Sequence, residues 1–270
     1  MMQSALQIRL ALVTGLTLAA VAVAGTGSRQ EAVTSESPAR GEIEEMIRDS
    51  GGTVSVAFRA QNGTQELLLN ADARFEDPNA LRIPVMITVY SAAYSQNIKL
   101  SDPVGSRTNS GPATQTIGET CQAMITQNGD PATNLLLERF TLPAIRAQIR
   151  ALGAEGMEIA AAFPNSEKNH TTARAVLILL WKLATDRVIS PDASKEMVGL
   201  LARSSLHAPP PAALPTPSAP PAGGSVLLHD AVIVYGAHSF VLVIQVQGLK
   251  DYATSAELVA RISAALNKAM

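Results

Sequence analysis

Cysteine and aromatic residues are scarce in this chain of 270 residues, histidine is rare and scattered, and each shortage excludes a class of site. The single cysteine, Cys121, cannot form an intramolecular disulfide, so the fold must depend on its core. Aromatic residues make up 4% of the chain and the net charge is −2, so we expect no nucleic-acid partner. The four histidines show no metal-ligand spacing such as H-E-x-x-H, so we expect neither a metal nor a cofactor.

The first 24 residues have the features of a secretory signal peptide. Arg9 supplies a positive charge, residues 10–24 are mostly apolar, and Ala22-Val23-Ala24 gives the small-x-small pattern that precedes cleavage. Cleavage after Ala24 would leave residues 25–37 as a flexible leader in a secreted or periplasmic protein with no membrane span. An uncleaved membrane anchor is the alternative, although the apolar run is shorter than the roughly 20 residues that cross a bilayer.

Alternating apolar and polar residues predict two hairpins at opposite ends of the chain. Residues 53–59 and 64–69 flank Asn62-Gly63, a strong hairpin signal, and residues 226–235 and 240–247 form the second pair. A lone hairpin is marginal in water, so we expect all four strands to share one antiparallel sheet. The residues expected to meet across it are Val54, Val56 and Phe58 from the first hairpin and Val241, Val243 and Ile244 from the second.

Helical periodicity predicts the rest of an α+β fold. Helices at 38–50 and 252–268 should pack together on one face of the sheet, and a mostly helical lobe is inserted at about 75–205. The Pro-rich residues 208–224 cannot join a sheet ladder, because proline lacks the N–H group. We therefore expect one domain over residues 38–270, with the Pro-rich insert outside the sheet.

Three segments of the inserted lobe carry a family resemblance. Phe75 and Ile83-Pro84-Val85-Met86 bracket one position, Ala132-Thr133-Asn134-Leu135-Leu136 follows a second, and Asn169-His170-Thr171-Thr172 flanks a third. In this order they resemble the nucleophile segment, the second motif and the deacylation loop of class A β-lactamases and penicillin-binding proteins. The resemblance covers about residues 40–268 and implies the fold of these serine hydrolases.

The catalytic motifs that the resemblance implies are all altered. The S-x-x-K motif is replaced by Asn79-Ala80-Leu81-Arg82. An amide cannot form the acyl ester, and arginine stays protonated, so it cannot act as a general base. The S-x-N motif becomes Asn128-Gly129-Asp130, without the hydroxyl that relays a proton. The K-[ST]-G motif should fall in residues 215–225, which are Pro-rich instead. We therefore expect no intact catalytic residue.

Four residues remain candidates for a degenerate site. Glu167 lies in the loop where the family has its deacylating base, although a solvated glutamate beside Lys168 explains it as well. Arg82 is expected to pair with Glu76 or Asp130, or else to bind an anion in the remnant cleft. Asp130 is a further binding candidate, and Asn134 matches a position that supports the active-site loop in the family.

Three functions are compatible with these observations. The first is a non-catalytic exported protein that binds a peptidoglycan-derived or β-lactam molecule, or a protein partner. The second is an active serine hydrolase that hydrolyses β-lactams with an unrecognised nucleophile; shared fold alone supports it. The third is an interaction protein whose Pro-rich residues 208–224 dock as a polyproline II helix.

Overall fold

The computed structural model describes residues 6–12, 35–36, 39–77, 79–105, 115–127, 129–163, 169–203, 226–236 and 238–269. Most of the predicted leader, the Pro-rich insert, Asn128 and Glu167 lie outside these residues. Within them, no helix is long and apolar enough to cross a membrane.

The sheet contains the four expected strands as antiparallel neighbours. These strands are β3 (Thr53–Ala60), β4 (Gln65–Leu69), β5 (Val226–Tyr235) and β6 (Phe240–Leu249), and their order is β5-β6-β3-β4. At the first hairpin Gly63 takes a positive φ of 74°, and the backbone N–H of Thr64 donates to the Asn62 side chain. The sequence prediction of one sheet shared by both ends of the chain is therefore confirmed.

Two further strands lie at the edges. Strand β1 (Leu6–Leu12) pairs in parallel with β5, and β2 (Ser35–Glu36) pairs in parallel with β4. The sequence analysis expected no strand at residues 6–12, which it assigned to a signal peptide. Leucine or isoleucine occurs there at every second position, and this period of two suits a strand beside the otherwise open edge of β5. Cleavage after Ala24 remains a prediction.

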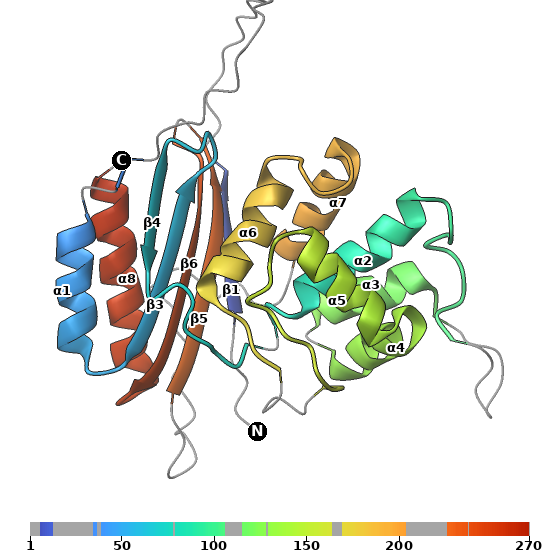
Figure 1. The fold of residues 1–270 in the computed structure, drawn as a ribbon, viewed down its shortest axis with the longest axis horizontal. Coiled ribbons are helices and arrows are strands. Elements are labelled where there is room, and N and C mark those ends of the chain that lie inside the picture. The colour runs from blue at the N-terminus through green and yellow to red at the C-terminus, as the bar shows by residue number, and fades with distance from the viewer. Residues whose placement is uncertain are drawn as a thin grey trace, which may run out of the picture.

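Helices α1 (Arg40–Ser50) and α8 (Tyr252–Lys268) cover one face of the sheet (Figure 1). Their apolar stripes meet a buried cluster that includes the strand residues Val56, Phe58 and Ile244. The cross-strand partners are Val54 with Val246, Val56 with Ile244, and Phe58 with Leu242. The expectation that Val241 and Val243 join this face is wrong: they belong to the cluster on the opposite face, because side chains alternate along a strand.

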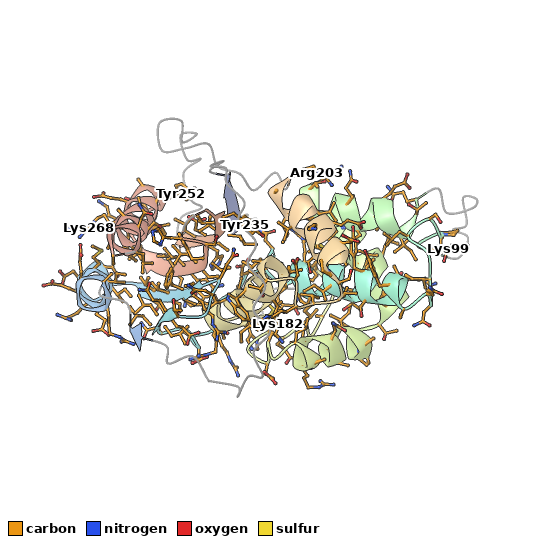
Figure 2. The ribbon with its side chains drawn as sticks, turned by 90° about the horizontal axis from the view of Figure 1, so that it is seen from above. Lys99, Lys182, Arg203, Tyr235, Tyr252 and Lys268 are labelled. Atoms are coloured by element: carbon orange, nitrogen blue, oxygen red, sulfur yellow. The ribbon has the colours of Figure 1, made fainter. Side chains whose placement is uncertain are left out.

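The helical lobe packs on the opposite face of the sheet. In the view from above, helices α1 and α8, the sheet and the lobe therefore form three successive layers (Figure 2). The helices of the lobe are α2 (Arg82–Tyr94), α3 (Ile117–Thr126), α4 (Asp130–Phe140), α5 (Leu142–Ala151), α6 (Ala173–Ala184) and α7 (Pro191–Ala202). Helix α6 lies directly on the sheet, where the indole N–H of Trp181 donates to the carbonyl of Ala60 at 3.2 Å. One continuous core joins the sheet to the lobe and positions the start of α2 between them.

Candidate functional site

Arg82 is the centre of a buried polar network at the start of α2. The residue is 3% exposed. Its guanidinium group donates from Nη1 to Oδ1 of Asn79 at 2.5 Å, from Nε to Oγ1 of Thr133 at 3.2 Å, and from Nη2 to Oδ1 of Asp130 at 2.6 Å. The structure therefore brings together three of the sequence candidates, Asn79, Arg82 and Asp130, and it selects Asp130 over Glu76 as the acid that pairs with Arg82.

A buried carboxylate holds the turn that precedes α2. Asp77 is fully buried, and its Oδ1 accepts from the backbone N–H of Ala80 at 3.0 Å. Its Oδ2 accepts from the side-chain amide of Gln245 on β6 at 3.3 Å. These bonds tie the Asn79–Leu81 turn to the sheet and fix where Arg82 enters the network. The sequence analysis missed Asp77, because an acid before a proline is common in exposed turns.

The start of α4 supplies the other half of the network. Asp130 and Pro131 occupy the first turn, where an acidic side chain and a proline are both favourable. The hydroxyl of Thr133 donates to the carbonyl of Gly129 at 2.9 Å while it accepts from Arg82. Its proton is therefore committed to the helix backbone, so Thr133 does not replace the missing relay hydroxyl.

The loop after α5 closes the network on a third side. The side-chain amide of Asn134 donates to the Phe163 carbonyl at 2.7 Å and accepts from the Phe163 N–H at 2.8 Å. This pair of bonds agrees with the expected loop-supporting role of Asn134. The buried Phe163 ring lies 5.8 Å from the Arg82 guanidinium, a cation–π contact. Among the described residues of this loop, Phe163 therefore presents a phenyl group to Arg82, and a phenyl group cannot accept a proton.

Asn169 connects the two ends of the same loop. Its Oδ1 accepts from the backbone N–H groups of Ala160 at 2.8 Å and Ala161 at 3.1 Å, and its amide donates to the Ala161 carbonyl. Thr171 continues the connection by bridging to Phe75 in antiparallel fashion. The loop therefore has a defined position at both ends, although Glu167 itself lies outside the described residues.

The cation of the network is already paired with carboxylates. Burial lowers the pKa of Arg82, while the hydrogen bond and charge of Asp130 and the charge of Asp77 act in the other direction. An arginine so placed remains protonated at physiological pH, because its unperturbed pKa is above 12. The three side chains together carry one cation against two carboxylates. A substrate carboxylate would therefore meet a site whose cation is already neutralised.

A histidine on β5 is a second buried polar group near the start of α2. His229 is fully buried, its Nε2 lies 3.0 Å from the carbonyl oxygen of Glu76, and its ring makes an edge contact with Phe75. The neighbouring Asp230 is 7% exposed. The sequence interpretation of His229-Asp230 as a surface pair is therefore wrong, because both lie inside a strand that is covered on its two faces.

No group of histidine, cysteine and acidic side chains that could hold a metal ion occurs among the residues that the structure describes. The place beside β5, where a strand from residues 215–225 would lie by chain order, is taken by β1. Among the described residues, the side chains in contact with the Arg82 guanidinium include an amide, a hydroxyl, a carboxylate and a phenyl ring. This set can bind and orient, but it offers neither a nucleophile nor a base in the position of S-x-x-K.

Comparison with known proteins identifies a family for this chain. Residues 38–270 match the sequence profile Beta-lactamase2, described as the β-lactamase enzyme family. No curated protein matches the chain.

Solved structures with the same fold are distant in sequence. The β-lactamase from Sphaerobacter thermophilus DSM 20745 is 19% identical, with a TM-score of 0.65 over 85% of this chain and 96% of that chain. A PBP-A mutant in an acyl-enzyme complex with penicillin G is 17% identical, with a TM-score of 0.69 over 86% and 95%. The TLA-1 extended-spectrum β-lactamase is 14% identical, with a TM-score of 0.66 over 86% and 97%.

Proposed function

The chain belongs to the β-lactamase enzyme family, and we propose that it acts within that family as a non-catalytic binding protein. The observation that carries this proposal is the Arg82 network. In the comparison with S-x-x-K, Arg82 stands at the position of the lysine. Its guanidinium group donates hydrogen bonds to Asn79, Thr133 and Asp130. Acyl transfer requires a nucleophile that can lose a proton and a group that can take it, and Asn79 and Arg82 offer neither at the positions compared with S-x-x-K.

The ligand proposed for this protein is a peptidoglycan-derived or β-lactam molecule that is held without a covalent bond. Support comes from the fold, since a PBP-A mutant with the same fold forms an acyl-enzyme with penicillin G. A protein partner is the alternative occupant. Sharing a fold does not transfer an activity, so the ligand has to be tested directly.

Export is part of the proposal and rests on the sequence of the first 24 residues. Cleavage after Ala24 would place the mature protein in the secreted or periplasmic fraction. It would also remove β1 and leave β5 as the edge strand of the sheet, with its outer backbone groups unpaired.

The deciding experiment measures covalent and non-covalent binding separately. The purified protein is incubated with a fluorescent penicillin and analysed by intact mass, and its affinity for penicillin G is measured by equilibrium dialysis. An active class A β-lactamase serves as the positive control. We expect no mass increase and no hydrolysis of a chromogenic cephalosporin. A stable increment equal to one penicillin, mapped to a serine, would instead support the active hydrolase.

That second function, an active serine hydrolase, is favoured by family membership alone. It would need a serine outside the S-x-x-K position. Ser55 donates its hydroxyl to the carbonyl of Asn70 at 2.6 Å, and Ser194 is fully buried within α7. Neither serine contacts the Arg82 network in the part of the chain that the structure describes, so the non-catalytic proposal is preferred.

A further inference from the structure

A pocket of about 530 Å³ lies between α2, α3 and α7, apart from the Arg82 network. The polar and charged residues that line it are Tyr90, Gln122, Lys195, Glu196 and Arg203. Its volume is within the range of pockets that bind small molecules. It shares no residue with the network around Arg82, so its occupancy can be tested independently of the proposed lack of acyl transfer.

Tyr90 lines the pocket. The residue is 7% exposed, and no hydrogen bond of its hydroxyl occurs among the described residues. The hydroxyl oxygen is not one of the buried side-chain atoms that lack a partner, so it is accessible rather than enclosed in the core. Burial raises the pKa of Tyr90 to about 12. The phenol is therefore a donor that a ligand in the pocket can reach.

Three charged side chains line the same pocket, and all three residues are exposed. Lys195 and Glu196 lie in the middle of α7, and Arg203 caps its C-terminal end (Figure 2). None of the three forms an ion pair with another residue in the ranges that the structure describes. Two cations suit the carboxylate of a ligand, and the single carboxylate suits an ammonium group on the same molecule.

A helical glycine lines the pocket. A Cβ atom added to Gly199 would meet nothing within 4 Å, so a small side chain fits there without a clash. Glycine within a helix is less favourable than alanine. Gly118 on the facing helix differs, since a Cβ atom there would lie 3.2 Å from the carbonyl oxygen of Leu100. Gly118 is explained by packing, whereas Gly199 borders open space at the pocket.

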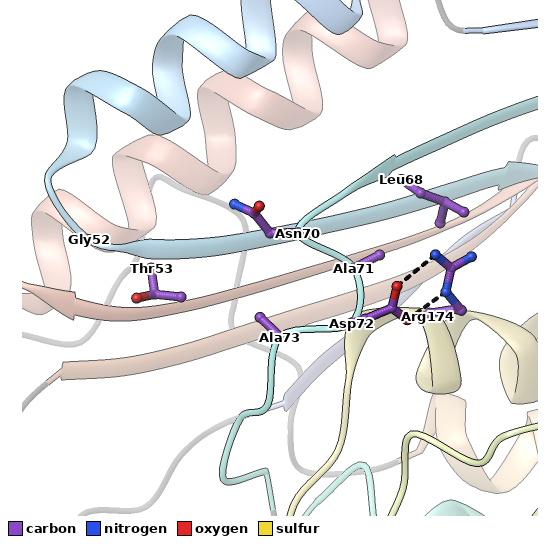
Figure 3. A pocket seen from close by; sticks show the side chains of 8 residues that line it. All are labelled: Gly52, Thr53, Leu68, Asn70, Ala71, Asp72, Ala73 and Arg174. Carbon is purple, nitrogen blue, oxygen red and sulfur yellow. Dashed lines mark hydrogen bonds and ion pairs between the residues drawn. The ribbon is translucent and has the colours of Figure 1, made fainter.

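A second pocket at the end of β4 provides the contrast (Figure 3). It also has a volume of about 530 Å³, but its charged groups are satisfied. Arg174 and Asp72 form two hydrogen bonds of 2.6 and 2.8 Å, and the Asn70 amide donates to the carbonyl of Val54. A ligand would have to displace these contacts, and no buried donor there is left without a partner among the described residues.

We propose that the pocket between α2, α3 and α7 binds a small zwitterion, a free amino acid or a short peptide with unblocked ends. The ligand carboxylate accepts from the Tyr90 hydroxyl and faces Lys195 and Arg203. The ligand ammonium group faces Glu196, and Gln122 offers an amide to the peptide backbone. Gly199 provides the space that the ligand chain occupies.

The test uses trialanine as the probe and N-acetyl-trialanine amide, which lacks both end charges, as its control. Binding to the full chain is measured by calorimetry and by backbone amide chemical shifts. We expect trialanine to bind with a dissociation constant of about 1 mM or tighter and to shift the amides around Gln122 and Gly199, but not those around Asn70. The blocked peptide should bind about tenfold more weakly, because it offers no end charge to Lys195, Glu196 or Arg203.

Substitutions at Gly199 and Tyr90 separate binding from folding. Gly199→Leu should fill the pocket and weaken trialanine binding at least about tenfold, whereas the matched Gly199→Ala should keep affinity within about threefold and raise the melting temperature. Tyr90→Phe should weaken binding about three- to tenfold and leave the melting temperature of the free protein unchanged, since the hydroxyl is accessible and no hydrogen bond within the described residues is lost. The proposal fails if the full chain does not bind trialanine at about 10 mM, if the blocked peptide binds equally well, or if Gly199→Leu and Gly199→Ala bind alike.

Discussion

Arg82 on α2 and Asp130 on α4 form an ion pair with a 2.6 Å separation between Nη2 and Oδ1. The arginine side chain is 4% exposed and the aspartate side chain is 38% exposed, so one partner is buried and the other reaches solvent. The pair joins the two segments that the sequence analysis compares with the S-x-x-K and S-x-N motifs. It connects the start of α2 to the start of α4, and this geometry leads to the predictions that follow.

Removing Arg82 should destabilise the protein more than removing its partner. Arg82→Ala leaves the buried Asp77 without a nearby cation and opens a cavity, so we expect a loss of about 2–4 kcal/mol in the free energy of unfolding. Asp130→Asn keeps a hydrogen-bond acceptor at the more exposed end of the pair, and we expect a loss of about 1 kcal/mol. Urea denaturation of both variants measures the difference. Equal losses would contradict the view that the arginine is the buried centre of the network.

Restoring the first motif should not restore catalysis. The double substitution Asn79→Ser with Arg82→Lys supplies a nucleophile and a candidate base, but the second and third motifs remain altered. Groups that act as one catalytic unit contribute in a strongly non-additive way. We expect slow acylation by a fluorescent penicillin at most, without turnover of a chromogenic cephalosporin. Asn79→Ser alone is the matched control, and multiple turnovers by the double variant would show that the remaining motifs are dispensable.

Asn134 should determine how firmly the loop at Phe163 is held. Asn134→Ala removes two hydrogen bonds to the Phe163 backbone, and we expect a loss of about 1–3 kcal/mol in stability. Hydrogen exchange at the Phe163 amide should accelerate, since its N–H loses its acceptor. Asn97→Ala is the control, because Asn97 is exposed at the end of α2. Unchanged exchange at Phe163 would mean that other contacts hold the loop.

Buried groups with raised pKa values should make the fold sensitive to alkali. Burial raises the pKa of the Cys121 thiol from 9.0 to about 12, and that of Tyr90 from 10.0 to about 12. Each folded-state value exceeds the unfolded one, so the unfolded chain loses its proton first as the pH rises. The stabilisation is complete below about pH 9 and is lost progressively toward pH 12. Urea midpoints across this range measure the loss, and Cys121→Ser should reduce its size.

The same burial predicts that Cys121 is chemically inert while the protein is folded. Its thiol should resist a thiol reagent at pH 8 and react fully in urea, because the thiolate is the reactive form. Rapid labelling of the folded protein would show that α3 opens locally.

The N-terminal prediction can be tested together with the role of β1. Intact mass of the exported protein should correspond to a chain that begins at Gly25. A variant lacking residues 1–24 should remain folded, because the four antiparallel strands and both buried clusters lie outside the deleted segment. A retained N-terminus, or a truncated protein that fails to fold, would show instead that β1 is a permanent part of the sheet.

Local patterns in the sequence were sufficient for most of the helices and strands. Alternation around Asn62-Gly63 gave the first hairpin, and the Ser190 cap before Pro191 gave the start of α7, since turns and caps depend on residues a few positions apart. The prediction that Asn79 and Arg82 stand where S-x-x-K would lie also comes from the sequence alone, because an amide and a guanidinium group are identified by residue type.

Only the tertiary structure decided which distant residues meet. The sequence left Arg82 a choice of acids, and packing of α2 against α4 selected Asp130, 48 positions away. It likewise buried His229 and placed the Phe163 ring over Arg82. The pocket around Tyr90 exists because three helices from separate parts of the chain leave a space between them. Such contacts depend on which faces of the helices and the sheet are buried against one another. A short stretch of sequence does not specify that pairing.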